Sequence, residues 1–265
     1  MSLLNKARTI FVILAIISIS YARTFRFKNT CVDPVWVGVL NNPGKELPRN
    51  GGFKLEAGQE DSVDTADDWA GRFWGRTGCN FDDSGNGQCA TGDCGAKLEC
   101  AGAGGVPPVS LAEFTLQGDQ GQDFFDISLV DGFNLPIAIT PDNCAGPVCT
   151  VNINENCPVD LQQKDSDGNV VGCFSDCAKT NAPEVCCSAD FATPETCSAP
   201  PNSGVFEGPC PQAYSWAYDD ATSTFTCQGG NYLITFCPSE DATQAGLAPK
   251  ATATQSGVRR RCMRR

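Results

Sequence analysis

Cysteine is the residue type that could support the widest range of chemistry in this 265-residue chain, which contains 17 cysteines and no histidine. Zinc sites usually combine thiolates with imidazoles, and sites built from cysteine alone use paired CxxC motifs, which this sequence lacks. Without histidine, the triads in which an imidazole activates a Ser or Cys nucleophile are excluded as well. The cysteines therefore predict a framework of disulfides, and we expect neither a metal site nor a cofactor.

The N-terminal segment predicts passage into an oxidising compartment. Residues 1–22 have a basic start, an apolar run over 10–19, and small residues at Ser20 and Ala22, as in a secretory signal peptide. The apolar run is shorter than the roughly 20 residues that cross a bilayer. We therefore expect a secreted, extracellular protein that is not stably inserted in a membrane, with a mature chain that begins near Arg23.

Charge is distributed unevenly along the chain. Residues 23–237 contain 11 Lys and Arg against 29 Asp and Glu, whereas residues 238–265 contain six basic residues against two acidic ones. The acidic body would repel nucleic acid and anionic lipid, so neither is an expected partner, although acidity also serves plain solubility. The Thr-, Ala- and Gln-rich composition of 238–265 predicts a disordered basic tail that carries Cys262, the odd cysteine.

Short segments of alternating or continuous apolar residues predict an antiparallel β-sandwich or a flattened barrel. Clusters of Gly, Pro, Asn and Asp separate these segments. Between Cys144 and Cys210 the apolar periodicity fades, which indicates a loop-rich region held by disulfides, with a short helix near 174–180. The predicted strands are 24–28, 35–40, 72–76, 111–116, 124–130, 214–216 and 232–236.

Residues 165–169, with the sequence Asp-Ser-Asp-Gly-Asn, are the one candidate for a cation-binding loop. They match the start of a calcium-binding loop, but the bidentate Glu that such a loop needs at its later position is absent. An Asp-Gly turn is therefore the favoured interpretation.

Several longer motifs resemble those of the thaumatin family. They are Trp74-Gly75-Arg76-Thr77-Gly78-Cys79, the cysteine-rich run 85–100, Val130-Asp131-Gly132-Phe133-Asn134, Thr222-Ser223-Thr224-Phe225-Thr226-Cys227 and Phe236-Cys237-Pro238. The resemblance extends over roughly 24–238 and includes sixteen family cysteines. It implies a thaumatin-like domain over 23–237, mainly β, with a flattened antiparallel sandwich or barrel core. A small stapled hairpin subdomain at about 77–105 and a disulfide-rich loop subdomain at about 144–211 would complete it.

The resemblance also implies the pairing of the sixteen cysteines. Adjacent cysteines can bond to each other only through a strained ring, so separate partners for Cys186 and Cys187 are physically reasonable. The implied pairs are Cys31–Cys237, Cys79–Cys89, Cys94–Cys100, Cys144–Cys227, Cys149–Cys210, Cys157–Cys173, Cys177–Cys186 and Cys187–Cys197.

A candidate site follows from the same resemblance, which implies an acidic cleft between the sandwich and the disulfide-rich subdomain. The residues at its matching positions are Arg72, Glu113, Asp126, Asp131 and Asp220. The sequence supports one part of this set independently. In 111–116 the alternation would turn Ala112 and Phe114 to the core and Glu113 outward.

Three functions remain open for this candidate site. The first is a monomeric, antifungal defence protein that binds β-1,3-glucan or another wall polysaccharide. The second is an endo-β-1,3-glucanase, in which Glu113 would be the acid and Asp131 the nucleophile or base, because glycoside hydrolysis needs two carboxyl groups. The third is an inhibitor or receptor ligand that acts through another surface. Against hydrolysis stands the alternative that Arg72 is a structural ion-pair anchor and the cleft only binds.

Overall fold

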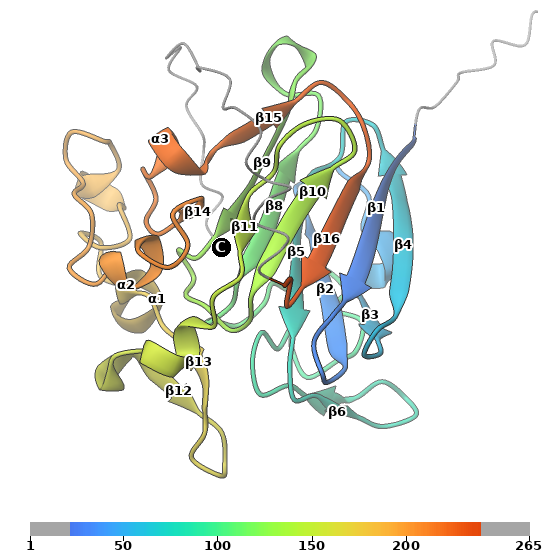
Figure 1. Ribbon diagram of the computed structural model, residues 1–265, viewed down its shortest axis with the longest axis horizontal. Coiled ribbons are helices and arrows are strands. Elements are labelled where there is room, and N and C mark those ends of the chain that lie inside the picture. The colour runs from blue at the N-terminus through green and yellow to red at the C-terminus, as the bar shows by residue number, and fades with distance from the viewer. Residues whose placement is uncertain (1–21, 240–265) are drawn as a thin grey trace, which may run out of the picture.

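The computed structural model describes residues 22–239, which form a sandwich of two β-sheets with loop-rich extensions (Figure 1). One sheet has five strands in the order β11-β10-β16-β1-β4. The other contains seven strands, in the order β14-β9-β8-β5-β2-β3, with β15 also paired to β9. The predicted fold class is therefore confirmed. The signal-peptide prediction, the tail prediction and Cys262 lie outside the described residues.

The strands are short, and the helices are a few residues long. The strands are β1 (Ala22–Asn29), β2 (Val35–Asn41), β3 (Gly52–Leu55), β4 (Glu60–Ala66), β5 (Ala70–Arg76), β6 (Asn80–Phe81), β7 (Gly87–Gln88), β8 (Leu111–Thr115), β9 (Asp123–Ser128), β10 (Ile137–Pro141), β11 (Val148–Cys149), β12 (Gln162–Lys164), β13 (Val170–Cys173), β14 (Ala213–Tyr214), β15 (Phe225–Cys227) and β16 (Tyr232–Phe236). The α-helices are α1 (Asp176–Thr180), α2 (Gly204–Glu207) and α3 (Asp220–Ser223), and the 3₁₀ turns are η1 (Pro48–Gly51), η2 (Asp119–Gly121), η3 (Ile153–Asn156), η4 (Val159–Leu161) and η5 (Ala189–Phe191).

Aromatic side chains fill the space between the two sheets. Phe25 of β1 packs against Phe73 of β5 and Phe114 of β8, with ring centroids 4.9 and 4.8 Å apart. Phe114 also meets Tyr232 of β16 edge to face at 5.1 Å. Such pairs add to the free energy gained by burying apolar surface. The period-2 alternation of these strands therefore defines the inner faces of the sandwich.

The sandwich is not wholly antiparallel, because its first and last strands run side by side in the same direction. Strand β1 pairs with β16 in parallel, with Asn29 opposite Phe236, and β14 pairs with β9 in parallel. Parallel strands end at the same edge of a sheet, so Cys31 and Cys237 follow directly from this pair and form a disulfide. The bond closes the longest loop in the described chain, which is the arrangement with the largest entropic stabilisation.

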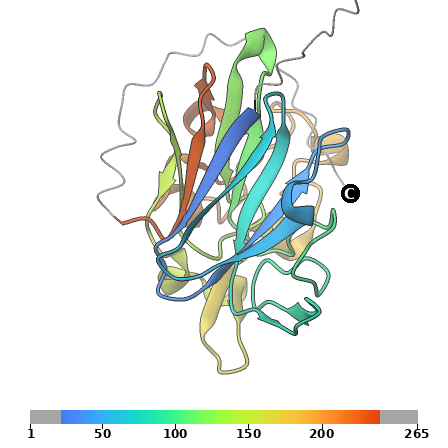
Figure 2. The same ribbon diagram turned by 90° about the vertical axis from the view of Figure 1, so that its right-hand side faces the viewer.

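Eight disulfides join the sixteen cysteines of the described chain, and these are the pairs that the family resemblance implies. Cys186 and Cys187 have separate partners, Cys177 and Cys197. Figure 2 shows the hairpin β6–β7 and its neighbouring loops at one end of the sheets, in teal. The disulfide-rich segments that contain α1 and α2 lie beside the large sheet, at the left of Figure 1.

The hairpin region is anchored to the large sheet by a buried arginine. Arg76 of β5 is 0% exposed and donates hydrogen bonds to the carbonyls of Lys97 and Leu98, at 2.8 and 2.6 Å, and to two carbonyls of β2. Burial lowers the pKa of Arg76 to about 10, against the opposing charge of Asp93. A second hydrophobic cluster lies around Trp74, on the outer face of the large sheet near the hairpin region.

The predicted strands agree with the structure to within two residues at each end, but several strands, among them β4 and β10, have no predicted counterpart. The strand predicted at 214–216 ends at Tyr214, because the amide and hydroxyl of Ser215 bind the Asp219 carboxylate at 3.1 and 2.9 Å and close a turn. The helix near 174–180 begins at Asp176, after Ser175 caps it. Asp165 accepts hydrogen bonds from the amides of residues 167 and 169, as in the predicted Asp-Gly turn. None of the helices within 22–239 has the length and apolar character needed to cross a membrane.

Candidate functional site

Three charged side chains lie in one row across the middle of the large sheet. Arg72 on β5 is directly opposite Glu113 on β8, and Glu113 is opposite Asp126 on β9. Opposite residues on antiparallel neighbours project to the same face, with Cβ atoms about 4.5–5.5 Å apart. We call Arg72, Glu113 and Asp126 the acidic row.

The acidic row faces away from the sandwich core because side chains alternate along β8. Ala112 and Phe114 are buried in the core, whereas Glu113 between them is partly exposed. The expected outward direction of Glu113 is therefore confirmed. Nη1 of Arg72 lies 3.6 Å from Oε1 of Glu113, and the two side chains are 33% and 36% exposed. This half of the row is open to a ligand.

The two ends of the acidic row differ in exposure. Asp126 projects from the same face as Glu113 but is 3% exposed. Its neighbours on β9, Phe125 and Ile127, point into the sandwich core. The row thus runs from an accessible ion pair on β5 and β8 to an enclosed carboxylate on β9.

Asp220, the fourth predicted residue, reaches this side of the sheet through Tyr214. The Tyr214 hydroxyl donates to Oδ1 of Asp220 at 2.7 Å and also contacts the Thr224 hydroxyl. Tyr214 lies opposite Ser128 in the parallel pair of β14 with β9. Residues two apart on a strand share a face, so Ser128, Tyr214 and Asp126 project from the same side. The first residue of α3 is therefore placed over the face that carries the acidic row.

Asp131, the fifth predicted residue, lies in the turn that follows β9. Its backbone carbonyl accepts a hydrogen bond of 3.2 Å from the amide of Val109, two residues before β8 begins. Asp131 is partly exposed. The turn thus places Asp131 at the shared end of the two strands that carry Glu113 and Asp126. That the carboxylates of Glu113 and Asp131 face each other remains a prediction.

A glycine-rich loop borders the row on the Arg72 side. Gly104 lies beside the Arg72 guanidinium, since a Cβ atom there would be 3.9 Å from Nη2. At Gly105 a Cβ atom would be 2.7 Å from Nε1 of the buried Trp74, which is closer than side-chain atoms approach. The two glycines therefore allow the loop to lie flat against Trp74 without covering Arg72.

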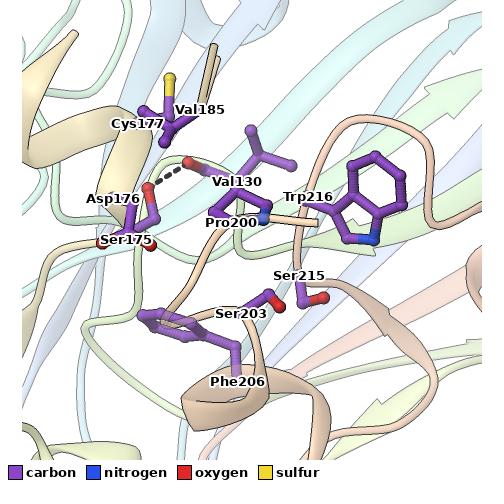
Figure 3. Close-up of a pocket in the computed structure, with 10 residues that line it drawn as sticks. All are labelled: Val130, Ser175, Asp176, Cys177, Val185, Pro200, Ser203, Phe206, Ser215 and Trp216. Carbon is purple, nitrogen blue, oxygen red and sulfur yellow. Dashed lines mark hydrogen bonds between the residues drawn. The ribbon is translucent and has the colours of Figure 1, made fainter. Parts of the chain in front are cut away.

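A small crevice lies between the end of β9, helices α1 and α2, and the turn after β14 (Figure 3). Val130, the neighbour of Asp131, lines it together with Phe206 and Trp216. The Ser175 hydroxyl donates a hydrogen bond of 2.6 Å to the carbonyl of Val130. The space inside is about 10 Å³, enough for one water molecule. The crevice therefore does not enclose an organic ligand.

The sequence did not indicate Tyr214 or Trp216 as site residues. Both fall in the predicted strand 214–216, where an aromatic side chain is equally compatible with a place in the core. The one signal in the sequence is that both residues lie close to Asp220 along the chain. The turn that Ser215 and Asp219 close is needed to bring this part of the chain together, and the sequence does not show it.

This arrangement is suited to binding polar, uncharged groups. Carboxylate oxygens accept hydrogen bonds from hydroxyl groups and the guanidinium donates them, and hydrogen bonds to charged groups are the stronger ones. One arginine does not neutralise four carboxylates, so anions would be repelled. The candidate site therefore favours a neutral ligand with many hydroxyl groups.

Comparison with known proteins identifies the family. Residues 29–238 match the model of the thaumatin family. "Thaumatin-like protein 1" of Pyrus pyrifolia is 50% identical over 224 residues, which cover 82% of this chain and 92% of that protein. "Glucan endo-1,3-beta-glucosidase" of Prunus avium is 48% identical over 225 residues, covering 83% of this chain and 92% of that protein.

A solved structure supports the fold at low sequence identity. A laminaripentaose-producing β-1,3-glucanase in complex with laminaritetraose aligns with a TM-score of 0.52 and 10% identity, over 81% of this chain and 98% of that chain. At this identity the likeness concerns the fold alone. Given the family model and relatives that are about half identical over most of their length, this chain belongs to the thaumatin family.

Proposed function

We propose that this protein is a secreted defence protein that binds β-1,3-glucan, or a related polymer of microbial walls, through the candidate site. The observation that carries the proposal is the acidic row. Arg72 and Glu113 present a donor and an acceptor side by side, both about one-third exposed, on the outer face of a rigid sheet. Polar groups that a rigid element holds in place lose little entropy on binding.

The ligand class follows from the chemistry of these groups. A glucan is uncharged, so the excess of carboxylates does not repel it, and its hydroxyl groups can donate to Glu113 and accept from Arg72. Asp220, whose carboxylate is hydrogen-bonded by Tyr214 at 2.7 Å, would add a third contact. The same excess of negative charge disfavours nucleic acid as a ligand.

The names of two relatives support a glucan ligand and a defence role. The Prunus avium relative is named a glucan endo-1,3-beta-glucosidase, and "Pathogenesis-related protein 5" of Arabidopsis thaliana is 50% identical over 221 residues. Secretion is part of the proposal, since eight disulfides are stable in an oxidising compartment and are unusual in a reducing one. We expect the protein to act as a monomer.

A pull-down on particles of β-1,3-glucan tests the proposal. We expect wild-type protein to bind these particles but not cellulose, and Glu113→Ala to weaken binding on the order of tenfold, because a charge-assisted hydrogen bond is lost. Glu56→Ala is the matched control, since Glu56 is an exposed partner of Lys54 away from the row. Equal binding by wild type and Glu113→Ala would exclude the row as the binding surface and favour a ligand for another surface.

Weak endo-β-1,3-glucanase activity is the second candidate, and the name of the Prunus avium relative favours it. Glu113 would protonate the leaving oxygen, and Asp131 would act as the nucleophile or base. A separation of about 5 Å between the two carboxyl groups fits a retaining enzyme, and about 6.5–9.5 Å fits an inverting one.

A reducing-sugar assay on a linear β-1,3-glucan separates hydrolysis from binding. If the protein hydrolyses the glucan, Glu113→Gln should abolish turnover and largely preserve affinity, because the amide keeps the shape of the side chain but has no acidic proton. If wild-type protein binds the glucan and releases no reducing sugar, the function is binding alone.

A further inference from the structure

The aromatic turn between β14 and α3 extends the candidate site. We propose that Trp216 is a stacking platform for a sugar ring of the bound glucan, next to Asp220. This inference rests on the proposed function and names a residue and a contact type that the acidic row does not supply. Sugar rings present apolar C–H faces as well as hydroxyl groups, and an indole provides a large, flat apolar surface at a low cost in conformational entropy.

The position of Trp216 is the first argument. Its crevice neighbour Val130 directly precedes Asp131, and Asp220 follows Trp216 by four residues in the same turn and helix start. Trp216 therefore lines the crevice together with the residue that precedes Asp131, and it belongs to the same turn as Asp220. Figure 3 shows Trp216 across the crevice from Asp176 and Cys177, with Val130 and Pro200 between them.

Exposure is the second argument. Among the four tryptophans of the chain, Trp69 and Trp74 are 0% exposed, whereas Trp36 and Trp216 are partly exposed. The crevice behind Trp216 has room for about one water molecule, so no sugar ring fits inside it. A ring can instead lie against the outer surface of the indole while its hydroxyl groups reach Asp220.

Rigidity of the turn is the third argument. Asp219 accepts hydrogen bonds from both the amide and the hydroxyl of Ser215, and the Ser215 hydroxyl also lies 3.1 Å from the Glu207 carboxylate of α2. Tyr218 then packs edge-on against Trp216, with ring centroids 6.0 Å apart and planes at 76°. Because the turn and the ring pair are already ordered, stacking a ligand on Trp216 loses little additional conformational entropy.

Two substitutions of partly exposed tryptophans test the inference. We expect Trp216→Ala to weaken the binding of a soluble β-1,3-glucan oligosaccharide by about tenfold in calorimetry, as for a central aromatic contact. Trp36→Ala is the matched control, and we expect it to bind as the wild type does. Trp36 lies on β2 beside Lys54 and Phe81, opposite Arg76 rather than in the acidic row.

Fluorescence makes the test independent of folding defects. In full-length protein, the oligosaccharide should change the tryptophan emission of wild type and of Trp36→Phe, but not that of Trp216→Phe. If wild type binds and either Trp216→Ala keeps full affinity or Trp216→Phe keeps the emission change, the platform is refuted while the proposed function stands. If wild type does not bind the oligosaccharide at all, the proposed function and the platform fall together.

Discussion

Two aspartates on strand β9 project from opposite faces of the large sheet and have different surroundings. Asp123 and Asp126 are both on β9, three residues apart, and so project from opposite faces of the sheet. Asp123 is 0% exposed and accepts a hydrogen bond of 2.7 Å from Tyr232 and one of 3.0 Å from the amide of Gln117. Arg23 lies 3.5 Å away. We call Asp123, Tyr232, Gln117 and Arg23 the buried cluster.

The comparison separates a structural carboxylate from candidate functional ones. The buried cluster ties the beginning of β1 to β9 and β16, and its donors converge on one anion away from water. The acidic row also pairs an arginine with a carboxylate, Arg72 with Glu113, but this ion pair is open to solvent and the strand neighbours of Glu113 face the core. An arginine–carboxylate contact is therefore not informative by itself. The number of donors on the anion and its access to water distinguish the two cases.

The largest expected effect is on stability, from Asp123→Ala. Removing the anion leaves the Tyr232 hydroxyl and the Gln117 amide without their acceptor and Arg23, which still donates to the Gly230 carbonyl, without its counter-charge. This should lower the free energy of unfolding by about 3 kcal/mol. Guanidinium unfolding with intact disulfides measures this. Asp64→Ala, at an exposed aspartate of β4, is the control and should cost less than about 0.5 kcal/mol. If Asp123→Ala lowers the free energy of unfolding by less than about 1 kcal/mol, the buried cluster is no more structural than the acidic row.

Tyr232→Phe should have a smaller effect, about 1–2 kcal/mol, because Asp123 keeps its other two partners. Burial, followed by the hydrogen bond to Asp123, raises the pKa of Tyr232 well above its usual 10.0. In the unfolded chain this phenol ionises near pH 10, whereas the folded protein holds it neutral. The stability that it contributes is therefore complete below pH 10 and is lost as the pH rises above that value.

Absorbance titration of tyrosinate checks the sign of this pH dependence. In the wild type, ionisation of Tyr232 should accompany alkaline unfolding and not precede it, and Tyr232→Phe should show a shallower loss of stability above pH 10. Reversible ionisation of Tyr232 in folded protein, at a pH below that of alkaline unfolding, would contradict the burial of the cluster away from water.

The smallest expected effect on stability comes from the acidic row. Arg72→Gln and Glu113→Gln should each change the free energy of unfolding by less than about 1 kcal/mol, because the pair is one-third exposed and 3.6 Å apart. Thermal unfolding of both single variants and the double variant measures this. A loss above about 2 kcal/mol for either one would mark Arg72 as a structural anchor, the alternative that the sequence leaves open.

Much of the fold and part of the site are readable from the residues themselves. Alternation of apolar side chains identifies β1, β2, β5, β8, β9 and β16, although not β4 or β10, and turns Glu113 outward, because the side-chain period of a strand is two. The density of cysteines and the absence of histidine predict disulfides and exclude histidine-based chemistry. The family motifs add the disulfide partners, which spacing alone leaves ambiguous, and the five candidate positions.

Other features depend on contacts between distant parts of the chain. Alternation predicts that Asp123 and Asp126 lie on opposite faces, but not that Arg23 and Tyr232, each about 100 residues from Asp123, converge on it. Nor does it predict the parallel pair of β1 with β16, or the hydrogen bond by which Tyr214 holds Asp220. The sequence by itself determined which residues share a face. Only the tertiary structure decided which faces are covered and which charges meet, because these depend on how the two sheets and their loops pack together.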